Sequence, residues 1–428
     1  MLLLRRGPVM GRRAAARCFS SGVLTREYIH SCLYRKEEGY FTSERREVLH
    51  APKQPIDFND LWGKREYKNQ VAALYQQDKE AWMTPVEVFY PYYSRAIANY
   101  MMMSPHTIHN DTGKLHIYEI GGGAGTNALC ILDYIKEQAP ALYAKTTYTM
   151  IEISARMAAR QQARVASHPN CKVVNTDILT YSKTHPKVND PCFFIAMEVL
   201  DNLPHDKVTL ADGEWYETRV RDGAEVQHPL RDPLITETLD YFACEIPLRG
   251  TFKRKSGLAT QLRSLIGMRE KLLTSAFVPT GAMQLLHTLR ESFPKHHLIA
   301  ADFDELPAPA LDASAAHKLY DHPRSPTSTA SGPLHAANAP LVASKTDGVT
   351  EDHDTYLVEG GIADIFFATD FVKLKQAYCR AMELKEHEVS IVKSGAFLQE
   401  FAEVDKTRTI LGYNPLIDDY ANTSFILS

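Results

Sequence analysis

The chain has 428 residues, of which 44% are hydrophobic and 23% are charged, the composition of a globular protein with one large domain or two smaller ones. The formal net charge of -4 argues against a general nucleic-acid binder. No apolar run approaches the roughly 18 residues that span a bilayer. The seven cysteines include no C-x-x-C pair, so we expect buried thiols and no metal site.

The first residues have the composition of a targeting segment. Six arginines and no acidic residue occur between Met1 and Arg26. This pattern is typical of a mitochondrial transit peptide, because a secretory signal needs a longer apolar core. Residues 17–20 resemble a matrix-processing site, so we assign 1–19 to the transit peptide and expect a matrix location. A basic arm that binds a membrane surface or nucleic acid is the alternative.

A glycine-rich turn follows the apolar run 115–118. Glu119 stands near the end of the expected strand, and Gly121, Gly123 and Gly125 follow it. Glycine is favoured where a Cβ would clash with the turn and where the backbone must approach a ligand closely. The sequence therefore predicts a loop that binds a nucleotide cofactor.

The same glycines also allow a dinucleotide loop. Gly123, Gly125 and Ala128 satisfy G-x-G-x-x-A, which would aim a helix N-terminus at a pyrophosphate. That pattern starts late, because the strand ends at Ile120, and it gives Glu119 no role. A nicotinamide-linked oxidoreductase is thus the less favoured alternative.

Two more acidic residues are expected at the same edge of the sheet. A predicted strand over 147–152 ends in Glu152, whose carboxylate can accept hydrogen bonds from both ribose hydroxyls or instead cap the next helix. A strand over 171–175 precedes Asp177, which can accept from the exocyclic amine of adenine or be a solvated turn residue.

The run 192–197 is almost entirely apolar, as expected for a central parallel strand covered on both faces. Glu198 and Asp201 follow it. Ligands of open α/β sheets bind beyond the carboxyl ends of the strands, so both carboxylates are candidates for the acceptor site. Alternatively, Glu198 organises the cofactor loops and Asp201 caps a short turn before Pro204.

These segments belong to a wider set of motifs, which comprises residues 38–43, 83–88, 119–126, 150–154, 198–204, 277–282, 361–365 and 369–371. Together they resemble the MidA-like methyltransferases, and the resemblance covers most of the chain from about Tyr28 onward. It implies an α/β fold with a Rossmann-like class I core and S-adenosylmethionine (SAM) as cofactor. The implied cofactor-binding residues are Glu119, Gly121, Gly123, Gly125, Glu152 and Asp177.

Mitochondrial members of that family act in complex I assembly and symmetrically dimethylate an arginine of a complex I subunit. The resemblance thus implies a protein substrate. Because two carboxylates can hold a planar guanidinium bidentately, we expect Glu198 and Asp201 to be the catalytic residues. A SAM-binding assembly factor or chaperone without catalysis is the alternative.

Composition also predicts the domain organisation. We expect a helical N-terminal region at 27–110, followed by the first half of the core at 111–205. An inserted α+β segment on the substrate side is expected at 206–293, and the core is completed by 294–306 and 355–428. Residues 307–352 are rich in Pro, Ala, Ser, Thr, His and Asp and have almost no aromatic residues. Such a segment buries too little apolar surface to offset its ordering, so we expect a disordered insert.

Overall fold

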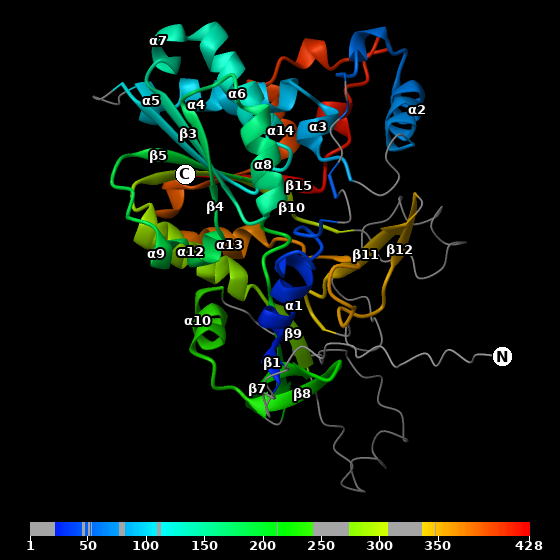
Figure 1. Ribbon diagram of the computed structural model, residues 1–428, viewed down its shortest axis with the longest axis vertical. Helices are drawn as coiled ribbons and strands as arrows, with labels where there is room; N and C mark the ends of the chain where they lie inside the picture. Colours follow the sequence, from blue (N-terminus) through cyan, green and yellow to red (C-terminus); the bar gives the residue numbers. More distant parts are fainter. Residues whose placement is uncertain are drawn as a thin grey trace, which may run out of the picture.

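The computed structural model describes residues 22–44, 48–49, 52, 54–76, 82–108, 113–211, 213–242, 274–306, 336–346 and 348–428. A seven-stranded sheet lies at the centre, in the order β14-β15-β10-β5-β2-β3-β4 (Figure 1). Its strands are β2 (Leu115–Ile120), β3 (Thr146–Glu152), β4 (Cys171–Asn175), β5 (Cys192–Met197), β10 (His296–Phe303), β14 (Ser390–Lys393) and β15 (Thr423–Leu427). The five strands from β10 to β4 are parallel, whereas β15 runs antiparallel to β10 and to β14.

The central strands are covered on both faces. In β5, Phe193 and Ile195 pack into one hydrophobic cluster, and Phe194 and Ala196 pack into the cluster on the other face. This alternation explains why the strand is apolar throughout. The fold is therefore α/β with a parallel core, and β5, β2 and β3 end at the same edge of the sheet.

Helices flank the sheet on its two faces (Figure 1). On one face lie α2 (Lys64–Tyr75), α3 (Pro85–Val88), α4 (Tyr92–Met103), α5 (Pro105–Ile108), α6 (Thr126–Gln138), α7 (Pro140–Tyr143), α8 (Ala155–Arg164), α14 (Ser394–Phe401) and α15 (Pro415–Asp418). On the other lie α9 (Tyr181–Thr184), α10 (Pro233–Tyr241), α12 (Thr280–Ser292) and α13 (Phe371–Met382). Within the described residues, no helix is both long and apolar enough to cross a membrane.

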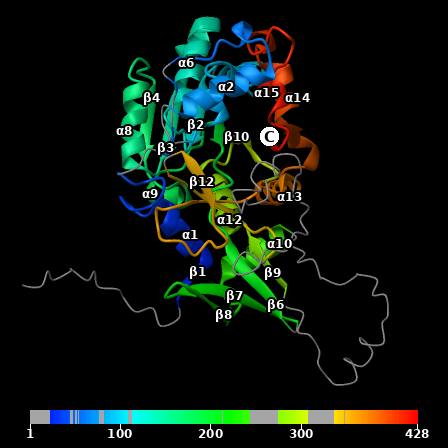
Figure 2. The same ribbon diagram turned by 90° about the vertical axis from the view of Figure 1, so that its right-hand side faces the viewer.

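A second sheet lies beyond the helices of the second face (Figures 1 and 2). It contains β1 (Val23–Leu24), β6 (Asp206–Ala211), β7 (Glu214–Arg221), β8 (Ala224–Pro229) and β9 (Thr274–Val278). Helix α1 (Thr25–Tyr34) packs against this sheet. Arg26 fixes α1 there through ion pairs of 2.7 Å with Asp206 and with Asp232.

Two expected boundaries differ from this arrangement. Residues 27–110 contain helices, but α1 lies on the second sheet while α2 to α5 lie on the central one. Helix α12, expected within the insertion, packs on the central sheet through Met283, Leu286 and Leu289. Both differences arise because packing partners far apart in sequence decide where a helix belongs. Residues 1–19 and 243–273 lie outside the described residues.

The expectation of a disordered insert over 307–352 is wrong at its C-terminal end. Strands β11 (Leu341–Thr346) and β12 (Val349–Asp352) form a hairpin there, and β11 also pairs with β13 (Asp364–Phe366). Val342 is fully buried in the cluster that contains Phe277 and Phe367. Composition averaged over the whole segment concealed this short apolar strand. Residues 307–335 lie outside the described residues.

This hairpin offers a matched stability test. Val342→Ala should lower the free energy of unfolding by about 1–3 kcal/mol, because it removes two buried methyl groups and leaves a cavity. Val349→Ala, on the partner strand at 68% exposure, should have little effect. Denaturant titration of both variants checks this, and equal effects would show that β11 is not packed as described.

Candidate active site

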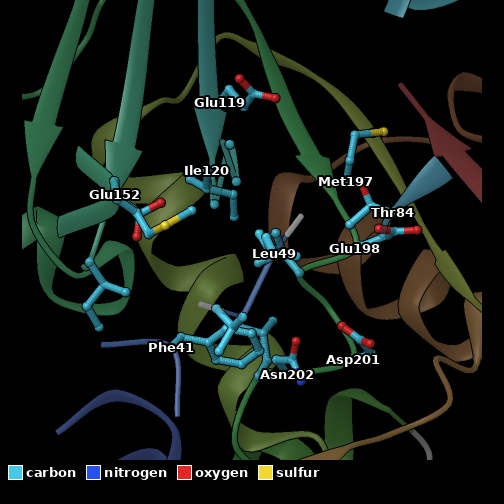
Figure 3. A pocket seen from close by; sticks show the side chains of 18 of the residues that line it. Phe41, Leu49, Thr84, Glu119, Ile120, Glu152, Met197, Glu198, Asp201 and Asn202 are labelled. Atoms are coloured by element: carbon cyan, nitrogen blue, oxygen red, sulfur yellow. The ribbon is translucent and has the colours of Figure 1, made fainter. Parts of the chain in front are cut away.

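A cavity of about 400 Å³ lies at the carboxyl ends of the central strands, within the size range of cofactor sites. Ile120 of β2 pairs with Ile151 of β3 and with Ala196 of β5, so these three strands end level and deliver their following residues to one place (Figure 3). Its lining includes the predicted Glu119, Gly121, Gly123, Glu152, Asp177, Glu198 and Asp201.

The glycine loop adopts the left-handed backbone that glycine favours. Gly121 and Gly123 have φ of 60° and 52°, and a Cβ on them would stand 2.9 Å from Val199 and 3.2 Å from Leu49. Gly125 is the predicted cofactor residue that is not among the described lining residues. It has φ of 81° and begins α6, and a Cβ there would stand 3.2 Å from the Cα of Gln161. Gly125 therefore allows helix packing, while the other two form the floor of the cavity.

Glu119 is buried and organises the loop. Its Oε1 accepts from Nδ2 of Asn127 at 2.7 Å, and its Oε2 accepts from the hydroxyl of Tyr148 at 2.9 Å. Burial raises the pKa of Glu119 to about 7, which these two bonds oppose. The carboxylate thus ties the loop and the first turn of α6 to β3.

Glu152 lies at the end of β3, across the cavity from Glu198 (Figure 3). Its Oε1 accepts from the backbone N–H of Ser154 and its Oε2 accepts from Nε2 of Gln161, both at 2.8 Å. Burial raises its pKa to about 7. Ser154 is the residue that caps α8, so the alternative role for Glu152 as the cap is not observed. A carboxylate oxygen accepts more than one bond, so both can still receive ribose hydroxyls.

Asp177 is fixed by two contacts. Its Oδ1 accepts from the backbone N–H of Leu179 at 2.8 Å and thereby caps a short 3-10 turn. Its Oδ2 lies 3.2 Å from Nε2 of His30, which comes from α1 and also lines the cavity. Asp177 is therefore a turn residue held at the cavity wall, and the adenine contact expected of it stays a prediction.

Glu198 follows β5 in an unusual backbone conformation. Its φ of 52° lies in the left-handed region, which costs an L residue about 1–2 kcal/mol. Burial raises the pKa of its carboxyl group well above the ordinary value, and the charges of Asp302 and Glu87 raise it further. Such strain persists where the surrounding structure holds it and is common at functional sites.

Asp201 stands beside Glu198 on the same wall of the cavity (Figure 3). It is only 6% exposed, and its Oδ1 has no hydrogen-bond partner among the described residues. Burial, followed by the charges of Asp302 and Asp364, raises its pKa well above the ordinary value. Its backbone N–H donates to Oδ2 of Asp302 at 3.1 Å. Its Oδ1 is therefore available to a hydrogen-bond donor from a ligand.

The cavity also contains residues that were not among the predicted site residues. Asn202 donates from Nδ2 to Oδ1 of Asp364 at 2.8 Å, and burial raises the pKa of Asp364 to about 7. Glu87 of α3 and Asn127 of α6 line the cavity as well. The 83–88 motif contains Glu87, but nothing in the sequence shows that α3 reaches β5.

The charge of the lining is one-sided. Seven of the described lining residues are Asp or Glu, and none of them is Lys or Arg. Buried carboxylates without cationic partners have raised pKa values, and a bound cation favours their charged form. The cavity therefore favours ligands that carry positive charge.

Comparison with known proteins decides the family. Residues 96–390 match the model of the family described as "Putative S-adenosyl-L-methionine-dependent methyltransferase". The chain belongs to this family. Its cofactor is accordingly SAM, and the dinucleotide interpretation of the glycine loop is excluded.

Relatives of this methyltransferase agree with that family. It is 24% identical over 228 residues to "Protein arginine methyltransferase NDUFAF7 homolog, mitochondrial" from Schizosaccharomyces pombe. The match covers 49% of this chain and 48% of the relative, so it spans about half the length of that curated protein. A COG1565 superfamily member from Burkholderia thailandensis, bound to S-adenosyl-homocysteine, has the same fold at 13% identity and a TM-score of 0.53. The structural match covers 96% of this chain and 88% of the Burkholderia chain.

The cavity of the methyltransferase fits its cofactor. SAM carries a sulfonium and an ammonium, and the described lining has seven Asp or Glu residues and no Lys or Arg. A Cβ on Gly121 or Gly123 would contact a neighbouring side chain. Because glycine has no Cβ, a ligand can approach the backbone closely at these positions. Residues at the ends of β2, β3 and β4 would hold the cofactor there.

Proposed function

We propose that this protein transfers methyl groups from SAM to an arginine side chain of a protein in the mitochondrial matrix, giving symmetric dimethylarginine on a complex I subunit. The observation that carries the proposal is the pair Glu198 and Asp201, which line one cavity with no Lys or Arg among its described lining. The mitochondrial arginine methyltransferase named among the relatives supports it, as do the arginine-rich, acid-free residues 1–19.

The chemistry requires precise placement of the acceptor. SAM supplies a methyl group on a good leaving group, so much of the rate depends on holding the acceptor nitrogen at about 3–3.5 Å from the methyl carbon. Arginine is protonated at every relevant pH and its charge is delocalised. Two neighbouring carboxylates that accept from a guanidinium fix its plane and draw charge toward the bound nitrogens. In the proposed complex Glu198 and Asp201 are this pair, and the nitrogen that they leave free faces the methyl group. As the N–CH3 bond forms, the S–CH3 bond breaks, its electron pair stays on the sulfur of S-adenosylhomocysteine, and the acceptor nitrogen gives up one proton to a carboxylate or to water.

Arginine binding should depend on pH. Burial raises the pKa values of Glu198 and Asp201 well above the ordinary value of a carboxyl group, and the charge of Asp302 raises both further. A guanidinium that binds the protonated pair must displace those protons. Affinity should therefore rise as the pH rises toward these raised pKa values.

A small probe tests this without knowledge of the substrate. Ethylguanidinium should stabilise the complex with S-adenosylhomocysteine more strongly as the pH rises, and more strongly than ethylammonium, which cannot bind bidentately. The difference between the probes should disappear in Glu198→Gln. Binding that is independent of pH, or equal for the two probes, would argue against a guanidinium site.

A further inference from the structure

Glu87 is a buried carboxylate that the transfer mechanism above does not use. It is 6% exposed and lines the cavity from α3. Burial raises the pKa of its carboxyl group. Its helix α3 contacts α6, which begins directly after the glycine loop. Glu87 therefore lines the same cavity as Glu198, on a helix that contacts the start of the cofactor loop's helix.

Asn127 supplies a second, independent observation. It is 2% exposed, lines the cavity, and donates from Nδ2 to Glu119. Because this bond fixes the orientation of the amide, Oδ1 must be the remaining acceptor, and it is buried without a partner among the described residues. An unpaired buried acceptor is costly, so its presence at a cavity wall indicates a ligand that donates to it.

The carboxylate of Glu87 and the Oδ1 of Asn127 favour the same class of ligand. A carboxylate and an amide oxygen that line one cavity from contacting helices can both accept hydrogen bonds from a cation with several N–H donors. Glu119 is 2% exposed, and its two oxygens accept from Asn127 and Tyr148, so these bonds orient the amide of Asn127. Asn127 follows the glycine loop directly in the chain, and the α-ammonium group of the cofactor is a cation with three N–H donors.

We propose that the carboxylate of Glu87 and the Oδ1 of Asn127 bind the α-ammonium group of SAM. Glu119 then acts indirectly, by orienting the amide of Asn127. Glu87 brings α3 into the cofactor site, so the region before β2 takes part in cofactor recognition. The inference depends on the cofactor and not on the acceptor, so it stands or fails separately from the arginine substrate.

Two nucleoside probes test it in binding measurements on the full chain. S-adenosylhomocysteine carries the ammonium group, whereas 5′-methylthioadenosine keeps the adenosine and sulfur but lacks the amino acid part. Glu87→Gln preserves the shape of the side chain. It should weaken the affinity for S-adenosylhomocysteine by about 10- to 100-fold, the range of a charge-assisted hydrogen bond. Affinity for 5′-methylthioadenosine should be unchanged. Asn127→Leu should show the same selectivity with a smaller loss.

Glu38→Gln is the matched control, since Glu38 is exposed in the same N-terminal part of the chain. It should leave both affinities unchanged. Equal weakening of both probes by Glu87→Gln would mean a structural role and would overturn the proposal. So would unchanged affinity for S-adenosylhomocysteine with reduced methyl transfer, because that result places Glu87 on the acceptor side.

Discussion

Glu198→Gln should reduce methyl transfer by about 100-fold while leaving the affinity for S-adenosylhomocysteine unchanged. Glutamine keeps the size of the side chain but loses the charge that holds a guanidinium, and a charge-assisted bond contributes roughly 1.5–3 kcal/mol. The carboxyl group is buried and its pKa is raised by burial and by Asp302 and Glu87. Neutralising it should therefore not destabilise the fold, so thermal denaturation should show an unchanged or higher midpoint.

Glu305→Gln is the control for this prediction, because Glu305 is an exposed carboxylate just after β10. It should retain full activity. Turnover is measured with labelled SAM, and affinity by calorimetry with S-adenosylhomocysteine. Wild-type turnover in Glu198→Gln would remove this residue from the catalytic role, and loss of cofactor affinity would favour its alternative role as an organiser of the cofactor loops.

Gly123→Val should abolish measurable SAM binding, a loss of more than about 100-fold. Gly123 has φ of 52°, and its Cβ would lie 3.2 Å from Leu49. A β-branched residue is strained in that backbone region, and its methyl groups would project into the cavity floor. The cofactor would lose both the space and the loop geometry.

Gly223→Val distinguishes the effect of backbone strain from the effect of a side chain that enters the cofactor site. Gly223 has φ of 74° in the turn between β7 and β8, and nothing lies within 4 Å of its Cβ position. This variant should lose stability through backbone strain but keep its affinity for SAM. If Gly123→Val bound SAM normally, the assignment of the loop would be wrong.

The cofactor-binding half of the site could be predicted from local sequence patterns. A strand, a glycine turn and an acidic residue at a strand end lie within a few residues of one another, and Glu119 and Glu152 could be found for that reason. Their partners could not all be inferred. Nothing in the sequence shows that Asn127 and Tyr148 occupy both oxygens of Glu119, because this depends on the register of β2 and β3.

Long-range pairings account for most of what the sequence did not predict. Strand β15 lies 120 residues or more beyond β10, yet the two pair antiparallel from Ile299 opposite Leu427 onward. Its residues Thr423–Leu427 are buried, but one short apolar run carries no information about its partner. Packing of the same kind brings Glu87 into the cavity that Glu198 lines and brings β11 against Phe277.

Transfer of methyl groups to arginine can be measured directly in a mitochondrial extract. The full chain is incubated with methyl-labelled SAM and a mitochondrial extract depleted of this protein, with Gly123→Val as the inactive control. The labelled protein is then hydrolysed and the modified amino acid identified. We predict label in symmetric dimethylarginine on one protein, absent with the variant. Label in another amino acid, or no label from a chain shown to bind SAM, would contradict the proposed function, and the second result would favour a binding factor without catalysis.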